Sequence, residues 1–218
     1  MTDSLWTRGA PIGGILFVVL LVVGVVLIGD HPDPDASDQE IADYLADGDK
    51  HTLNIIGLYF WALAGVSLLW FLSHLRGVLR SAEGGSGALS NLGFAAGLVF
   101  TALLMAGGST IAAVAGAVEF RDATNIDPAF VKVLPQMGYS MLLLGGGFAA
   151  IVLVLTTSLV ALQTGVFPQW LAWLGLVAAF ILLFAIIFLP MIALLVWVLA
   201  VAIVLLGRQE GAATAAGA

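Results

Sequence analysis

The chain contains no cysteine and very few charged residues. Of its 218 residues, 61% are hydrophobic and only 10% carry a charge. The absence of cysteine excludes disulfides, thiolate metal sites, cysteine nucleophiles and lipidated cysteines. A soluble domain carries roughly 25% charged residues, so most of this surface must face lipid. The net charge of −7 also argues against nucleic-acid binding, which requires a basic surface.

Six apolar segments predict membrane-spanning helices. About 20 residues, at a rise of about 1.5 Å each, cross a hydrocarbon core about 30 Å thick. We therefore predict an all-α polytopic membrane protein whose single domain, residues 1–218, is a six-transmembrane-helix bundle. The predicted spans are 12–29, 53–72, 92–117, 139–162, 171–188 and 191–206, with outer loops at 30–52 and 118–138.

The last two predicted spans are separated only by a proline. Residues 171–206 carry no charge, and as one helix they would be about 54 Å long, which exceeds the hydrocarbon core. Pro190 cannot donate a helical hydrogen bond and disfavours helical geometry at Leu189. A hairpin is therefore predicted, and its two halves form either two full spans or a re-entrant pair.

The distribution of charge predicts the orientation. Six spans place both termini on one side, together with Arg76 and Arg80 at the end of the second span. That side holds four of the seven basic residues, whereas eleven of the fourteen acids lie on the other side. Because Lys and Arg are enriched in cytoplasmic loops, we expect a plasma-membrane protein with both termini in the cytoplasm.

Residues 30–50 hold eight of the acids and one lysine. Ser37 and Glu40 have the spacing of a capping box, which predicts a short helix. Its apolar face would be Ile41, Tyr44 and Leu45, with Gly48 as the stop. The candidate partner surface is formed by Asp33 and Asp35 of the extended lead-in and by Asp38, Glu40, Asp43 and Asp47 of this amphipathic outer helix.

The second outer loop predicts another amphipathic helix. Asp127 followed by Pro128 is typical of an N-cap and first helical residue, and an apolar strip of Phe130, Val131 and Leu134 follows. Arg121 and Lys132 are the expected ion-pair partners for the acids of the first loop.

No arrangement of residues in the chain predicts chemistry. The spans contain no Asp, Glu, Lys or Arg, which argues against a proton relay or voltage sensor. His51 and His74 flank the second span and are expected to be solvated. The acidic loop fails as an EF-hand because Asp38 and Tyr44 replace the required glycine and glutamate, which leaves open only a weak attraction of cations to its surface carboxylates. We therefore predict no catalytic, cofactor or metal site, and no enzyme activity.

Small residues in the third and fourth spans predict close helix packing. Small residues four apart let helix backbones approach in lipid. The candidate packing residues are Gly93, Gly97, Gly108, Ala112, Gly116, Gly145 and Ala149. The alternative interpretation is that the segments LGGGF and AGGST are flexible breaks.

The overall layout resembles a group of uncharacterised small six-span integral membrane proteins that occur in actinobacteria. The resemblance rests on the segments DASDQEIADYLAD, WFLSHLRGVLR and TGVFPQWLAWLGLV and on the proline-split end. It implies a plasma-membrane location and no particular activity.

We expect a non-enzymatic membrane protein, an accessory or scaffold component, that works through protein–protein contacts on its acidic outer face. The partner would be another membrane protein or a second copy of this chain. The alternative is a channel or carrier for a neutral or lipophilic solute, lined by small and hydroxyl residues of the third and fourth spans.

Overall fold

The computed structural model describes residues 2–121, 123–187 and 189–216, and every regular element among them is a helix. This confirms the all-helical prediction. The elements are α1 (Thr2–Ile28), α2 (Asp38–Ala46), α3 (Gly48–Glu83), α4 (Ala88–Ile111), α5 (Ala113–Arg121), α6 (Pro128–Ser140), the π-helical turn η1 (Met141–Gly146), α7 (Gly147–Thr164), α8 (Gln169–Leu182), the 3₁₀ turn η2 (Ala185–Ile187) and α9 (Met191–Ala216).

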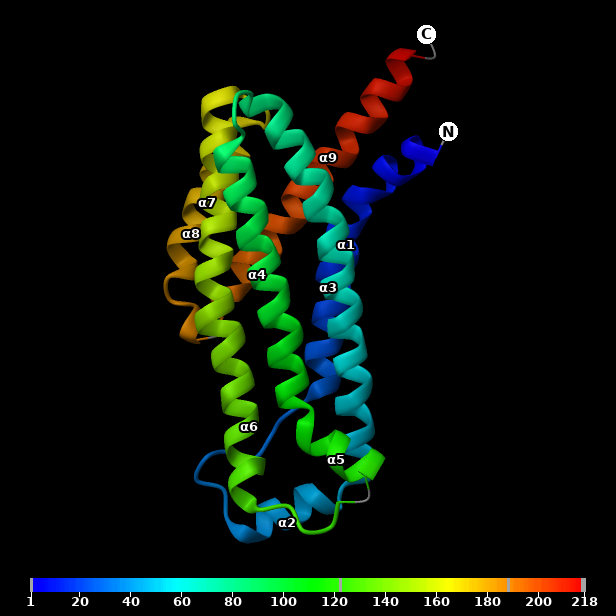
Figure 1. Cartoon of the computed structure of the whole chain (residues 1–218), viewed down its shortest axis with the longest axis vertical. Coiled ribbons are helices and arrows are strands. Elements are labelled where there is room, and N and C mark those ends of the chain that lie inside the picture. The colour runs from blue at the N-terminus through cyan, green and yellow to red at the C-terminus, as the bar shows by residue number, and fades with distance from the viewer. Residues whose placement is uncertain (1, 122, 188, 217–218) are drawn as a thin grey trace.

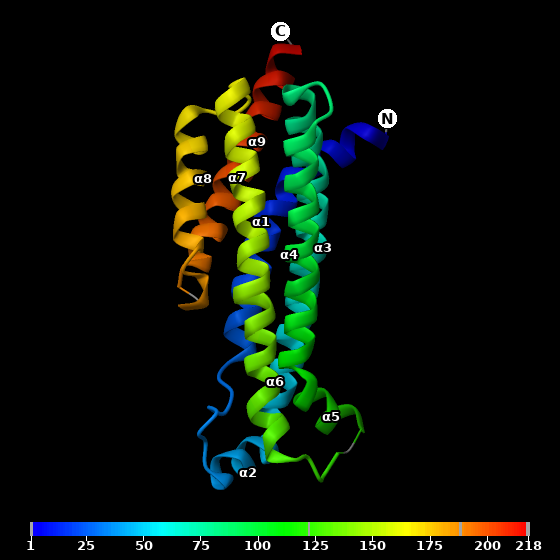
Figure 2. The same cartoon turned by 60° about the vertical axis from the view of Figure 1, so that its left-hand side comes forward.

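The helices form an elongated bundle with two different ends. The N- and C-terminal helices α1 and α9 project from one end, whereas α2, α5 and the start of α6 close the other (Figure 1). The helix α3 runs the full length of the bundle, as does the continuous rod formed by α6, η1 and α7 (Figure 2).

Five helical stretches in the described part of the chain are apolar and long enough to cross a membrane. They are Gly9–Ile28, Gly48–Glu83, Ala88–Ile111, Pro128–Thr164 and Met191–Gln209. The fifth predicted span, 171–188, is shorter: α8 has 14 residues, or about 21 Å at a rise of about 1.5 Å per residue. The structure therefore supports a multi-pass membrane architecture with five helices of membrane length.

The turn between α8 and α9 lies partway along the bundle. Both views place it well short of the end that carries α2 (Figures 1 and 2). Pro190 lies in a turn immediately before α9 begins at Met191, as predicted for the hairpin. The predicted span 171–188 is too long, because α8 ends at Leu182 and a 3₁₀ turn follows.

The predicted loop boundaries also need correction. Asp47 caps α3 by accepting a hydrogen bond from the Lys50 backbone N–H, so Gly48 begins α3, although we expected it to end α2. The third span stops at Ile111, where a break at Ala112 separates α4 from α5. Most of the predicted loop 118–138 is helical, because α6 continues into η1 and α7.

A close helix contact in the apolar part involves glycines that we did not single out. A Cβ placed on Gly57 of α3 would lie 2.9 Å from the backbone oxygen of Gly24 in α1. The indole of Trp61 also packs on Gly24. This small-residue contact allows α1 and α3 to run side by side, which is the geometry that stabilises helix pairs in lipid.

The end of the bundle opposite α2 has its own polar contacts. Glu83 accepts hydrogen bonds from the backbone N–H groups of Leu89 and Ser90 at the start of α4. Arg76 donates to the side chain of Asn91 and lies over the ring of Phe94. These contacts order the short α3–α4 connection.

Candidate functional site

The acidic end of the molecule is a cap with its own apolar core. Ile41 and Tyr44 of α2 pack with Val114 of α5 and Val131 of α6, and all four side chains are buried. Leu45 and Leu134 lie at the edge of this core. This confirms the predicted docking face of α2. Phe130 departs from the expected strip, because its side chain is 58% exposed.

The predicted capping box at the start of α2 is present. The Glu40 carboxylate accepts from the Ser37 backbone N–H at 2.6 Å, and the Glu40 N–H donates to Ser37 Oγ at 3.3 Å. The backbone bond from Ser37 lowers the pKa of Glu40 below its usual value. The bond from the Lys50 N–H likewise lowers the pKa of Asp47. These two carboxylates are therefore structural caps as well as surface charges.

The other four carboxylates of the predicted partner surface, Asp33, Asp35, Asp38 and Asp43, are exposed. Asp33, Asp35 and Asp43 line a surface depression of about 550 Å³ together with Asp30, Glu40 and Lys50. The structure thus brings together acids from the extended lead-in and from α2. Their role as a partner surface stays a prediction.

The cations near this surface do little to neutralise it. Lys50 pairs with Asp47 at 3.4 Å. Lys132 reaches the first loop, but its Nζ donates to the Ala36 backbone oxygen at 2.6 Å. Within residues 2–121, 123–187 and 189–216, no ion pair joins Arg121 or Lys132 to a carboxylate of residues 30–50. The expected cross-loop ion pairs are therefore wrong in form: Lys132 connects the loops through a backbone carbonyl.

Beneath the cap, a buried asparagine ties the first loop to α3. Asn54 is 2% exposed, and its Nδ2 donates to the Ile28 backbone oxygen at 3.3 Å. The same group lies 2.9 Å from Nε2 of His31, within hydrogen-bond distance of the imidazole. His31 also packs against the rings of Tyr44 and Tyr139.

His51 corrects our expectation of a solvated histidine. Its side chain is fully buried, with its ring 5.2 Å from that of Tyr44 and Nδ1 3.8 Å from a Glu119 carboxylate oxygen. Burial also raises the pKa of the Tyr44 hydroxyl to about 12. His74 is half-buried near the opposite end of α3. The described residues contain no group of three or more acidic or histidine side chains placed to hold a metal ion.

Lowering the pH should weaken the attachment of the first loop to α3, because His31 takes up a proton. Burial lowers the His31 pKa, and Asp30 opposes the shift only in part. As pH falls below about 6.5, the unfolded chain takes up the proton first, so folded-state stability decreases. We expect the thermal midpoint to drop more between pH 7.5 and 5.5 in the wild type than in His31→Gln. Equal drops of the thermal midpoint in the two proteins would contradict the assignment of this pH dependence to His31, because His51 and His74 are common to both proteins.

The predicted small-residue face divides between several neighbours. A Cβ on Gly93 would meet the Thr156 hydroxyl of α7, and one on Gly145 would lie 2.9 Å from Leu103 of α4. Gly97 and Gly108 instead face Leu72 and Trp61 of α3. Ala112 and Ala149 are buried, whereas Gly116 has only Phe120 of its own helix nearby. The first three residues of the segment LGGGF, Leu144 to Gly146, lie within the π-helical turn η1. This segment is therefore both a packing surface and a local π-helical distortion.

No protein-family model matches the chain, and no curated protein or solved structure matches it either.

Proposed function

We propose that this chain is a non-enzymatic plasma-membrane protein that works as an accessory or scaffold component, binding a protein partner through its acidic cap. The observation that carries the proposal is the cap itself. An independent apolar core holds α2 in place, while the carboxylates around it point into solvent. An ordered surface of one charge sign attracts and orients a partner of the opposite sign.

The charge balance supports a partner with a basic surface. Eight acids lie within residues 30–50, and two of them serve as helix caps. The described cations of the cap pair with only one of these eight, through Lys50 and Asp47. The depression lined by Asp33, Asp35 and Asp43 offers several carboxylates to a lysine or arginine of the partner.

We further propose that the cap lies outside the cell and both termini inside. Arg76, Arg80 and Arg208 lie at the opposite end of the bundle from the acids, in agreement with the positive-inside rule. The six inserted helices would be four full spans followed by the α8–α9 hairpin. The amphipathic helix α2 and the first turns of α6 then cover the outer face.

The interior packing supports this function over the solute channel or carrier. Three hydroxyls of the third and fourth spans donate to their own helices, Thr101 to Gly97, Thr156 to Val152 and Ser158 to Val154, while the Thr157 hydroxyl is buried without a hydrogen-bond partner among the described residues. The region around Gly145 and Gly146 is filled by Leu103 and Phe100 of α4. Hydroxyls that are satisfied and packed in this way offer no lining for a neutral polar solute.

The test is affinity purification of the full chain from its own membranes in mild detergent. We expect a stoichiometric partner with the wild type, and at least a tenfold loss of that partner in the triple variant Asp33→Asn, Asp35→Asn and Asp43→Asn. These positions avoid the capping residues Glu40 and Asp47. The matched control replaces the same three residues with glutamate, which keeps the charge and should retain the partner. A wild-type chain that purifies as a clean monomer, or a partner that survives the asparagine variant, contradicts the proposal.

A further inference from the structure

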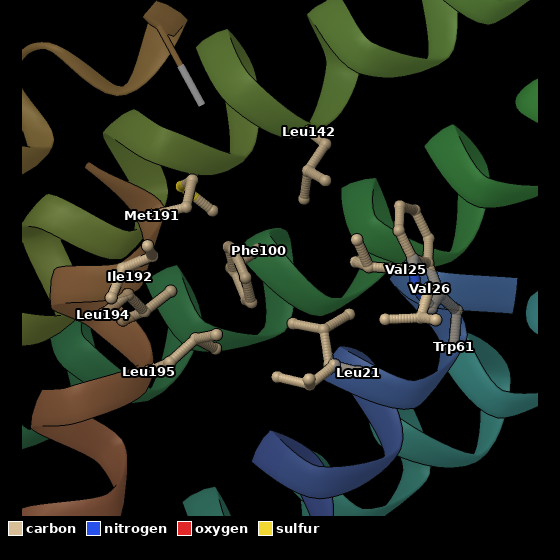
Figure 3. Close-up of a pocket in the computed structure, with 11 residues that line it drawn as sticks. Leu21, Val25, Val26, Trp61, Phe100, Leu142, Met191, Ile192, Leu194 and Leu195 are labelled. Carbon is tan, nitrogen blue, oxygen red and sulfur yellow. The ribbon is translucent and has the colours of Figure 1, made fainter. Parts of the chain in front are cut away.

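A groove in the apolar part of the molecule begins where the α8–α9 hairpin stops. Its wall residues come from α1, α3, α4, η1 and the first turns of α9 (Figure 3). Leu21 and Val25 of α1 line it opposite Met191 and Leu194 of α9, with Phe100 between them. The groove exists because the hairpin tip ends before α1 does, so the last turns of α1 lack a neighbour on that side.

The chemistry of this groove is that of an alkyl chain. All eleven of its lining residues are apolar or aromatic, and its cavity volume is about 170 Å³. An engineered apolar cavity of about 150 Å³ stays free of water and binds benzene. Val26 lines the groove and is 74% exposed, so the cavity opens sideways, toward the surrounding lipid in a membrane.

The groove continues toward the cap and becomes polar there. A second cavity of about 620 Å³ shares Val25, Val26 and Trp61 with the first. Its remaining wall includes Asp30, Gln136 and Tyr139, next to the acidic loop. An occupant of both parts must therefore be apolar at one end and able to form hydrogen bonds at the other.

Trp61 lies where the two parts meet and has an unused donor. Its side chain is 2% exposed, and its indole Nε1 has no acceptor within the described residues. A buried N–H without a partner costs about 1–3 kcal/mol, and a buried tryptophan usually finds a partner for this group. The Nε1 atom lies against Gly24 and is covered in this structure, so a carbonyl oxygen on a bound molecule would become its partner only after a small shift of the indole ring.

We propose that the groove binds an uncharged ester lipid, such as a diacylglycerol, taken up sideways from the outer leaflet. One acyl chain fills the cavity at the hairpin tip, and its ester carbonyl accepts a hydrogen bond from Trp61. The free hydroxyl lies toward Gln136 and Tyr139. Asp30 and the neighbouring acids disfavour lipids with an anionic headgroup, because like charges repel at short range. This site adjoins the protein-binding surface proposed above, and Asp30 lines both.

The experiment uses the purified full chain in phosphatidylcholine nanodiscs that contain a diacylglycerol with a photoactivatable group on its acyl chain. Peptide mass spectrometry locates the cross-links, which we expect on residues 21–26 and 191–195. Excess unlabelled diacylglycerol should compete, whereas the anionic lipid phosphatidylglycerol should not. Cross-links spread evenly over the lipid-facing helices, or equal competition by the anionic lipid, overturn the proposal.

Two variants test the groove itself. Val25→Trp fills the cavity and should reduce the groove cross-links at least tenfold, whereas Val66→Trp, on a face of α3 that is 57% exposed, should leave them unchanged. Trp61→Phe keeps an aromatic ring and removes the donor together with part of the indole, so we expect a loss of groove cross-links of about threefold to tenfold, which is the usual weight of one neutral hydrogen bond. Cross-linking that is unchanged in Trp61→Phe rejects the assigned donor, and this readout stands even if Val25→Trp fails to fold.

Discussion

Replacing Gly138 with alanine is expected to destabilise the folded chain, although alanine is the better helix former. Gly138 of α6 faces Gly107 of α4, and a Cβ on Gly138 would lie 2.5 Å from the Gly107 backbone oxygen and 2.6 Å from Ile111 Cγ1. A backbone oxygen in a helix cannot move aside as a flexible side chain can. The cost of overpacking, about 1–3 kcal/mol or more, should therefore exceed the gain of about 1 kcal/mol from helix propensity.

Gly77→Ala is the matched control for this prediction. Gly77 also lies inside a helix, but a Cβ there would meet no atom within 4 Å. The substitution should therefore stabilise the chain by up to about 1 kcal/mol. The stability of both variants is measured by unfolding them with increasing fractions of SDS in mixed micelles while the helix content is monitored by far-UV circular dichroism. Shifts of the same sign in the two variants would show that α4 and α6 do not approach as closely as the structure indicates.

Local signals in the sequence were sufficient to predict the cap. The Ser37–Glu40 capping box and the Asp127–Pro128 helix start depend only on residues within three positions of each other, and both are present. The spacing of Ile41 and Tyr44 correctly identified the buried side of α2. Hydrogen bonds and faces of this kind are set by neighbours along one helix, so no knowledge of the rest of the fold is required.

His51 was misjudged because its helix is longer than its apolar run. The buried side of α3 is marked by Asn54, Trp61 and Leu68, and His51 lies three residues before Asn54 on the same helical face. Extending that periodicity toward the Asp47 N-cap would have predicted burial. Hydropathy ended the span at Leu53 instead, and a histidine beyond that limit looked like an interfacial residue.

Pairings between helices could not be predicted from the sequence. Gly93, Gly97 and Gly108 of α4 were identified as packing residues, but Gly97 and Gly108 contact α3, while Gly107, which was not identified, contacts α6. A residue's spacing shows which face it lies on, but the neighbour of that face depends on how all the helices are arranged. The same reason explains why the close approach of Gly24 to Gly57 was not anticipated.

A cysteine introduced at Leu189 is expected to resist membrane-impermeant maleimides applied from either side of the membrane. Leu189 is 68% exposed and lies in the turn between α8 and α9. The first turns of α9 line the groove beside Leu21, which is two helical turns, or about 10 Å, before the end of α1 at Ile28. If α1 ends at the outer edge of the hydrocarbon core, the hairpin tip lies inside that core.

Because the chain contains no native cysteine, each introduced thiol reports on a single position. Asp43→Cys in the cap should react in intact cells, and Ser86→Cys in the α3–α4 connection should react only in inside-out vesicles. Leu189→Cys should react only after detergent is added, which also shows that its thiol is intact. Labelling of Leu189→Cys from outside would mean that α8 and α9 both cross the membrane fully. Reversed labelling of Asp43→Cys and Ser86→Cys would instead invert the whole topology, because the acidic cap would then face the cytoplasm.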